Sequence, residues 1–315
     1  MIGQYPTPVE RLDKLGLWVK RDDLTSPVYG GNKVRKLERL IPDAIERGKK
    51  RIVTVGAVGS HHVLATAVFG ARAGLGVEAA IVPQRRTEHV ERNVRADLAA
   101  GATLRPARTY VGAGISALLH GGRDAYLVPM GGSNVVGSLG YVDAAFELAK
   151  QIETGLLPEP DAIVVTLGSG GTAAGLTAGV ALAGMKTIVI GVVVASPVWF
   201  VTGWTRRLVR RVYAAAGGRD PRALEGRLQI VTSELGRGYG EPTDSARRAL
   251  EIGRENGLSL DLTYTAKCFA GALAYVQNTP NSNVLYWHTL SSAPLDELLE
   301  NAPPLPRAVE RLLRG

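Results

Sequence analysis

The segment DAIVVTLGSGGTAAGLTAGVAL at residues 161–182 joins an apolar run, a glycine-rich turn and an Ala-rich stretch typical of a helix. The turn consists of Gly168, Ser169, Gly170, Gly171 and Thr172. A strand, a Gly-rich turn and a helix in this order present free backbone N–H groups and the positive end of a helix to a phosphate. We therefore predict a phosphate-binding loop at 168–172.

The same glycines approximate the GxGxxA pattern of dinucleotide-binding proteins. That pattern needs an acidic residue about 20 positions further on, at the end of the next strand. Here the next apolar run ends in VVVASPV at 192–198, without Asp or Glu. No Gly-Lys-Ser/Thr follows the loop, so a nucleoside triphosphate site is not favoured either. A phosphate loop for another cofactor is favoured, and a structural glycine turn remains the alternative.

Short apolar runs alternate with amphipathic stretches through most of the 315 residues. The expected strands lie at 51–55, 77–82, 125–128, 162–167, 187–194 and 284–287. The expected helices lie at 34–47, 62–73, 87–100, 140–154 and 242–256. Such alternation predicts an α/β fold with parallel sheets flanked by helices. We expect a large domain of residues 1–48 and 149–315 and a small domain of residues 49–148.

The formal net charge of +8 raises the question of a nucleic-acid partner. The basic residues are scattered, aromatic residues make up only 6%, and no nucleic-acid-binding motif occurs, so we expect none. The apolar region at 162–201 is rich in Gly and Ala and is interrupted by Lys186, which predicts a buried core and no membrane span. The single cysteine, Cys268, and an N-terminus without an apolar signal segment predict a cytoplasmic protein.

A second segment, GGNKVRKLE at 30–38, forms a glycine turn into an expected helix. Lys33 and Lys36 lie three residues apart and so share one helix face. Alone, this pattern is typical of a helix start with two solvated lysines. Its combination with the other motifs changes the interpretation.

The chain resembles the fold-type-II pyridoxal-phosphate enzymes, in the family of the D-cysteine desulfhydrases and 1-aminocyclopropane-1-carboxylate deaminases. The resemblance runs nearly end to end. Besides the two segments above, the matching stretches are TPVERL (7–12), WVKRDDLT (18–25), MGGSNVVGSLGYVDAAFEL (130–148), GYGEPT (238–243), LDLTYTAKCFAG (260–271) and VLYWHT (284–289).

The resemblance implies that Lys33 binds pyridoxal phosphate covalently, since a desolvated lysine amine is neutral and nucleophilic. The loop at 168–172 then holds the phosphate, with Lys36 as a second contact. Thr265 and Thr289 contact the cofactor at positions where the deaminases have Glu and Leu and the desulfhydrases have threonines. A hydroxyl leaves the pyridine ring a weaker electron sink than a carboxylate does, which favours β-elimination over ring opening.

Further active-site positions follow from the same resemblance. Ser60, in GAVGSHHV at 56–63, assists proton transfer, and its place at a helix start suits a substrate carboxylate. Tyr239 and Tyr264 match two active-site tyrosines that can relay a proton. His61 stands where the family has an Asn that contacts the cofactor, and we expect His61 and His62 to bind substrate as well.

Other departures from the family pattern, at Leu64 and Leu290-Ser291, leave the cofactor assignment intact and bear on the substrate. No metal is expected, because the adjacent His61 and His62 point in different directions on a helix and no third ligand lies at suitable spacing.

The expected activity is that of a lyase that expels the β-substituent of D-cysteine, or of another β-substituted amino acid, to give a keto acid and ammonia. An aminocyclopropane-carboxylate-type deaminase and an amino-acid racemase remain alternatives on the same fold. A non-catalytic ligand-binding relative is the alternative from another class. By analogy with the family, we expect a homodimer.

Overall fold

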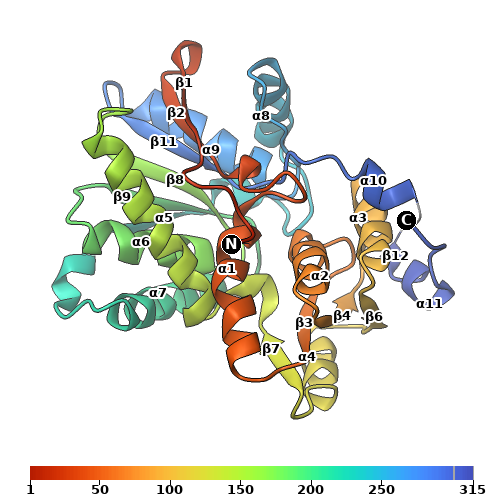
Figure 1. Ribbon diagram of the computed structural model, residues 1–315. Helices are drawn as coiled ribbons and strands as arrows, with labels where there is room; N and C mark the ends of the chain where they lie inside the picture. Colours follow the sequence, from red (N-terminus) through yellow and green to blue (C-terminus); the bar gives the residue numbers. More distant parts are fainter. Residues whose placement is uncertain (301, 315) are drawn as a thin grey trace.

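The computed structural model describes residues 1–300 and 302–314, and its strands form two main sheets with helices around them (Figure 1). The large sheet has the strand order β1-β2-β11-β8-β9-β10 and the small sheet the order β6-β4-β3-β7. Among the described strands, only β1 and β2 pair in antiparallel fashion; the other neighbours in both sheets are parallel. The predicted α/β class is confirmed. Within the described residues, no helix is long and apolar enough to cross a lipid bilayer.

The large sheet is buried on both faces, as its continuous apolar runs predict. Ile163 and Val165 of β8 pack with Leu176 of α6 on one face. Val164, between them, packs with Phe269 of α9 on the other face. The strands are β1 (Val9–Leu12), β2 (Leu17–Arg21), β8 (Ala162–Leu167), β9 (Ile188–Val193), β10 (Leu228–Val231) and β11 (Val284–His288). The helices are α1 (Asn32–Glu46), α5 (Val135–Glu153), α6 (Gly171–Leu182), α7 (Val198–Ala215), α8 (Asp244–Glu255) and α9 (Thr265–Asn278).

The small sheet lies beside the large one and has helices of its own (Figure 1). Its strands are β3 (Arg51–Ala57), β4 (Gly76–Val82), β6 (Thr103–Pro106) and β7 (Ala125–Val128). The helices that follow these strands are α2 (His61–Arg72), α3 (Glu88–Ala99) and α4 (Tyr110–Leu119). Towards the C-terminus, α10 (Asp296–Glu300) and α11 (Arg307–Glu310) lead to β12 (Leu313–Arg314), which pairs with β5 (Gln84–Arg85).

The observed elements agree with most of the expected ones, and they bear on the domain division. The C-terminal Val309 and Leu312 pack against Val58 and Val63, beside the small sheet. The expected boundary at residue 148 falls inside α5. This helix begins at Val135 rather than at residue 140, because the side chain of Asn134 accepts a hydrogen bond from a backbone N–H of the first turn. The division into a large and a small domain remains a prediction.

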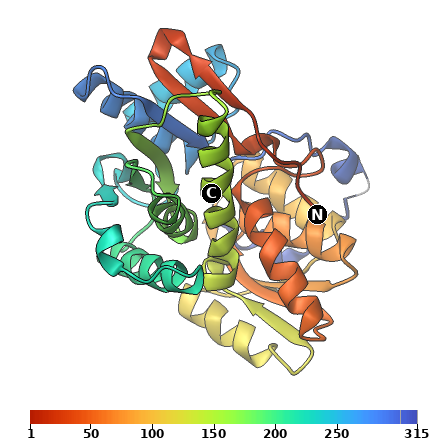
Figure 2. The ribbon, with the colours of Figure 1, turned by 60° about the vertical axis from the view of Figure 1, so that its left-hand side comes forward.

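Helices α1 and α5 run side by side between the two sheets (Figure 2). The carboxyl ends of strands from both sheets meet at one place. Ser133 follows β7 of the small sheet, Ser169 follows β8 of the large sheet, and their Oγ atoms are 2.7 Å apart. Ligands of open α/β sheets bind outside the carboxyl ends of the strands, so the site is expected here.

Asp22, directly after β2, is the centre of a buried polar cluster. Its Oδ1 accepts hydrogen bonds from Arg35 Nη2 at 2.8 Å and from Thr7 Oγ1 at 3.0 Å. Its Oδ2 accepts from Trp287 Nε1 at 2.7 Å and from Tyr141 Oη at 2.8 Å. Burial alone would raise the pKa of Asp22, but Arg35, Lys20 and the hydrogen bond from Trp287 together outweigh it and the pKa is lowered. The carboxylate stays charged and ties β2, α1, α5 and β11 together.

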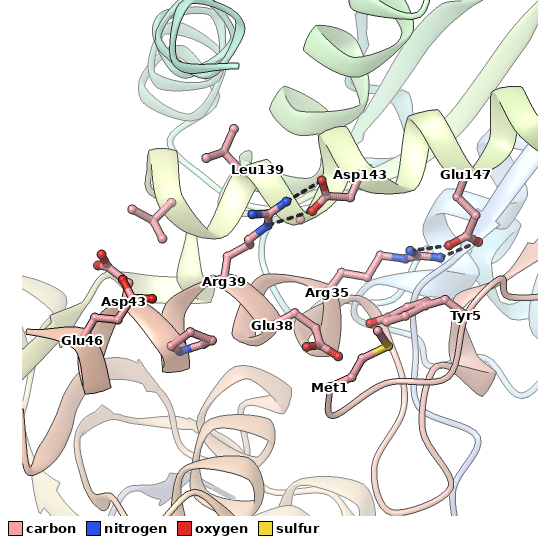
Figure 3. A pocket seen from close by; sticks show the side chains of 13 residues that line it. Met1, Tyr5, Arg35, Glu38, Arg39, Asp43, Glu46, Leu139, Asp143 and Glu147 are labelled. Carbon is pink, nitrogen blue, oxygen red and sulfur yellow. Dashed lines mark hydrogen bonds and ion pairs between the residues drawn. The ribbon is translucent and has the colours of Figure 1, made fainter. Parts of the chain in front are cut away.

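A cavity of about 690 Å³ lies between α1 and α5 (Figure 3). Two arginines of α1 point along it toward carboxylates of α5. Arg35 Nη1 lies 3.0 Å from Glu147 Oε2, and Arg39 Nη2 lies 2.7 Å from Asp143 Oδ1. Because both arginines are already paired, we assign no ligand to this cavity.

Replacing Asp22 should destabilise the fold far more than replacing an exposed partner of the same chemistry. Asp22→Ala leaves the buried Arg35 without one of its carboxylate partners, which typically costs about 3–5 kcal/mol of unfolding free energy. Asp143→Ala breaks a half-exposed pair, typically worth about 0–1 kcal/mol. Urea unfolding followed by circular dichroism measures both, and equal losses would contradict the central role of Asp22.

Candidate functional site

The predicted phosphate loop closely approaches both Lys36 and Ser133. Gly170 caps α6 in a left-handed conformation with φ of 86°. At Gly171, a Cβ atom would lie 2.5 Å from Ser133 Oγ and 2.8 Å from Lys36 Nζ. Glycine is therefore required here, because any side chain would displace these polar groups.

Lys36 is a buried amine next to this loop. Its Nζ donates hydrogen bonds to the carbonyl of Gly131 at 2.9 Å and to Ser133 Oγ at 3.1 Å. Within the part of the chain that the structure describes, no carboxylate forms an ion pair with it. Burial, assisted by nearby Lys33, lowers the pKa of Lys36 well below its usual value. A buried amine without an anion, beside the positive end of a helix, fits the phosphate of the expected cofactor.

Lys33 is connected to the same loop through its neighbour in sequence. Its Nζ donates to Asn32 Oδ1 at 2.8 Å, and Asn32 Nδ2 donates to Thr172 Oγ1 at 3.0 Å. Burial of the amine lowers the pKa of Lys33 to about 8, although Asp261 opposes this shift. A substantial fraction of the amine is therefore neutral, and nucleophilic, slightly above neutral pH.

Ser60 is the N-cap of α2, and its hydroxyl oxygen accepts from the backbone N–H of His62 at 3.2 Å. The imidazole of His62 is turned toward β3, where its Nε2 lies 2.8 Å from Thr54 Oγ1. His62 is buried and is not among the residues that line the open cavity described below, and its role in substrate binding stays a prediction. Adjacent residues of a helix point in different directions, and here only His61 reaches the cavity.

The two predicted active-site tyrosines meet each other. The hydroxyls of Tyr239 and Tyr264 are hydrogen-bonded, and their ring centroids are 5.8 Å apart. The ring of Tyr264 also lies edge-on to His61, with centroids 6.2 Å apart. Burial raises the pKa of both tyrosines, so both hydroxyls stay protonated at neutral pH.

The two predicted cofactor threonines make contacts of different kinds. The Thr265 hydroxyl donates to Asp261 Oδ2 at 2.8 Å, which fixes the start of α9. Thr289 accepts the backbone N–H of Asn32 with its carbonyl at 3.1 Å. The contact of Thr289 joins the end of β11 to the start of α1, and the contribution of either hydroxyl to the pyridine ring stays a prediction.

An open cavity of about 1290 Å³ lies next to His61 and the tyrosine pair. His61 and Tyr239 line it, as do Leu290 and Ser291, the two residues that depart from the family pattern. Ser291 Oγ accepts the backbone N–H of Gly30 at 2.8 Å, so this wall is held against the turn that precedes α1. The volume exceeds the roughly 300–1,000 Å³ of most small-molecule sites, so it has room for a molecule of the size of an amino acid.

Sequence reasoning missed four residues of the site. Asn32 and Ser133 lie inside the motifs GGNK and GGSN, which would have identified them as candidate site residues. Tyr29 and His89 line the cavity and contact His61, but no motif marks either of them.

The amine of Lys33 should react with pyridoxal phosphate with a half-maximal rate near pH 8. The neutral amine is the nucleophile, so the rate should rise with pH through this value and level off above it. An unperturbed lysine would instead rise toward about pH 10.4. Stopped-flow absorbance on cofactor-free protein measures the profile, and Lys33→Ala should lack the phase. A midpoint near pH 10 would contradict the assignment.

Lys36→Met should weaken cofactor binding without weakening the fold. Loss of a charge-assisted contact to phosphate costs about 1.5–3 kcal/mol, or roughly ten- to hundredfold in Kd. The Tm of the cofactor-free variant should stay equal or rise, because a buried amine without an ion-pair partner is removed. Fluorescence titration and thermal unfolding measure the two effects, with the exposed Lys186→Met as control. Unchanged cofactor affinity in Lys36→Met would rule out the phosphate contact.

The chain is similar in sequence to proteins of known family. Residues 1–289 match the family described as pyridoxal-phosphate-dependent enzymes. The chain is 34% identical over 308 residues to nocardicin C-9' epimerase of Nocardia uniformis, covering 94% of this chain and 93% of the relative. It is 32% identical over 287 residues to a D-cysteine desulfhydrase of Klebsiella pneumoniae, covering 85% of each.

A solved structure agrees in fold. The crystal structure of an ACC deaminase homologue superimposes with a TM-score of 0.81 at 29% identity, covering 95% of this chain and 94% of the other. The resemblance inferred from the motifs is thereby confirmed. The chain belongs to the fold-type-II pyridoxal-phosphate-dependent enzymes, in the family of the D-cysteine desulfhydrases and 1-aminocyclopropane-1-carboxylate deaminases, and pyridoxal phosphate is its cofactor.

Proposed function

We propose that this enzyme is a lyase that expels the β-substituent of D-cysteine, or of another small β-substituted amino acid, and releases a keto acid and ammonia. One observation carries the proposal. The amine of Lys33, with a pKa of about 8, is joined through Asn32 to the phosphate loop. The relative named D-cysteine desulfhydrase supports this choice of substrate.

The residues around Lys33 can bind the substrate and move its proton. When bound, pyridoxal phosphate supplies the electron sink that makes the Cα proton acidic. Lys33 would hold the cofactor and, once displaced by substrate, its neutral amine can accept that proton. Ser60 starts α2, whose first backbone N–H groups would bind the substrate carboxylate. Its oxygen accepts from His62 N, so its own proton is free for transfer.

The tyrosine pair would assist departure of the β-substituent. One hydroxyl of the pair donates to the other, which leaves the second O–H free to donate elsewhere. Because burial keeps both tyrosines protonated, the pair can supply a proton to a leaving thiolate. Thr265, in place of a carboxylate near the cofactor, supports elimination rather than ring opening.

Racemisation is the second candidate, favoured by the relative named nocardicin C-9' epimerase. It requires return of a proton to the opposite face of Cα without loss of a β-substituent. Chiral chromatography of an amino acid that lacks a leaving group, such as alanine, distinguishes the two activities. The aminocyclopropane-carboxylate deaminase activity is tested by release of its keto acid, and a non-catalytic role is excluded by any turnover.

We also propose that the enzyme works as a homodimer in the cytoplasm. The single cysteine is buried and suits a reducing compartment. Sedimentation at equilibrium tests the dimer, and a monomer at micromolar concentration would reject it.

Wild-type enzyme should release sulfide and pyruvate from D-cysteine. Ser60→Ala should lower kcat about a hundredfold or more, the usual contribution of a positioned proton-transfer group. Cofactor loading, read from the visible absorbance, should change little, and Ser116→Ala on α4 serves as control. Unchanged turnover in Ser60→Ala would remove Ser60 from the mechanism, and a wild type inert toward β-substituted amino acids would reject the lyase.

A further inference from the structure

Two histidines and a tyrosine form a hydrogen-bonded chain along the cavity. Tyr29 Oη lies 2.6 Å from His61 Nδ1, and His61 Nε2 lies 2.9 Å from His89 Nε2. Tyr29 is buried in the turn before α1, whereas His89, on α3, is exposed. The chain therefore leads from the interior of the site to water.

The side chain of Asn93 fixes the direction of these hydrogen bonds. Its Nδ2 donates to the carbonyl of Gly59 at 2.9 Å and lies 3.3 Å from His89 Nε2. An amide nitrogen only donates, so His89 Nε2 is an acceptor. The single lone pair of His89 Nε2 accepts chiefly from the nearer donor, so the proton between the two imidazoles belongs to His61 Nε2 at 2.9 Å, and the contact with Asn93 at 3.3 Å is the weaker one. A neutral His61 has a bare Nδ1, which accepts the hydroxyl proton of Tyr29.

The surroundings keep the two imidazoles neutral. Desolvation is the main reason that the pKa of each imidazole is lowered, and the neighbouring His89, followed by Lys33 on α1, lowers the pKa of His61 further. On the outer histidine, Asp261 before α9 opposes the shift and Arg92 of α3 adds to it. The tyrosine is kept protonated by burial, with Asp97 of α3 and Asp261 raising its pKa. Every member is thus neutral and able both to donate and to accept.

We propose that Tyr29, His61 and His89 form a proton relay between the active-site cavity and solvent. This proposal rests on the proposed lyase function. In the resting arrangement, Tyr29 lines the cavity and its Oη donates to His61 Nδ1, so the lone pairs of this oxygen can accept a proton. When it accepts a proton, its own proton passes to His61 Nδ1, the Nε2 proton of His61 passes to His89 Nε2, and the Nδ1 proton of His89 leaves to water.

The relay transfers one proton outward and then one proton inward. After the outward transfer, both imidazoles hold their proton on the other nitrogen, which is the arrangement needed to carry a proton inward. Return transfer from water restores the resting state that Asn93 favours. One proton leaves and one enters in each cycle, which matches a reaction that removes a proton from Cα and later protonates a product. Lys33 would take the proton from Cα, as proposed above, and Tyr29, His61 and His89 would carry protons between the cavity and water.

The resting tautomers provide a test that needs neither cofactor nor turnover. In cofactor-free protein labelled with ¹⁵N-histidine, long-range ¹H–¹⁵N spectra distinguish bare from protonated ring nitrogens. The chain has five histidines, so single substitutions to Gln assign the signals. His61 should be protonated on Nε2 and His89 on Nδ1. A charged His61, or the opposite tautomers, would overturn the relay.

The second test measures proton movement in the loaded enzyme. Exchange of the Cα proton of D-alanine with D₂O reports proton transfer without any leaving group. His89→Ala should slow this exchange about tenfold or more at unchanged KM. Because His89 lies on the open cavity, added imidazole should restore the rate, which a structural defect would not allow. The control is His120→Ala, which removes an imidazole that bonds to its own helix. Its exchange rate should equal that of the wild type, with or without added imidazole.

The outcomes separate the two proposals. Full exchange in His89→Ala, or a loss that imidazole does not restore, overturns the relay and leaves the lyase standing. A wild type that exchanges D-alanine but releases no sulfide from D-cysteine overturns the lyase, while the variant still tests the relay. A wild type that does neither overturns both.

Discussion

Burying a carboxylate costs desolvation free energy, and without partners it could not stay ionised in the interior of a protein. The position of α1 depends on the partners that keep Asp22 ionised. Its oxygens accept from four side chains, of which Arg35 carries the compensating charge. Arg35 lies in the first turns of α1, between Lys33 and Lys36. The ion pair therefore fixes the rotation of this helix, and the two lysines on its other side are directed to the phosphate loop.

The electrostatic design of the site is opposite to that of the Asp22 cluster. In the cluster, buried charges of both signs neutralise one another. At the loop, two amines are held with hydrogen bonds to carbonyl, amide and hydroxyl groups only, as far as the described residues show. Neutral acceptors position an amine without neutralising it. The site thus keeps a preference for an anion, which the cofactor phosphate satisfies.

The sequence allowed prediction of those parts of the site that follow local rules. A loop such as 168–172 is recognisable because strand, glycine turn and helix are contiguous in the sequence. Lys33 is recognisable because it lies within the contiguous motif GGNKVRKLE. Strands β1 and β2 were not predicted, because charged residues interrupt their apolar patterns. The contacts of Asp22 with Tyr141 and Trp287 join residues more than 100 positions apart, and the orientation of His62 depends on its helix. The chain from Tyr29 to His89 joins a turn to a helix of the other sheet. A pattern of neighbouring residues does not predict contacts between segments that are distant in the sequence.

Ser133 and Ser169 touch at the phosphate loop although each follows a strand of a different sheet. A cofactor bound there is a cross-link between the two halves of the molecule. A ligand that binds only the folded state adds stability that grows with the logarithm of its concentration. Binding of the cofactor is therefore thermodynamically linked to folding of the protein. The lifetime of this enzyme in a cell would then follow the supply of vitamin B6, and starvation for the vitamin would lower its abundance as well as its activity.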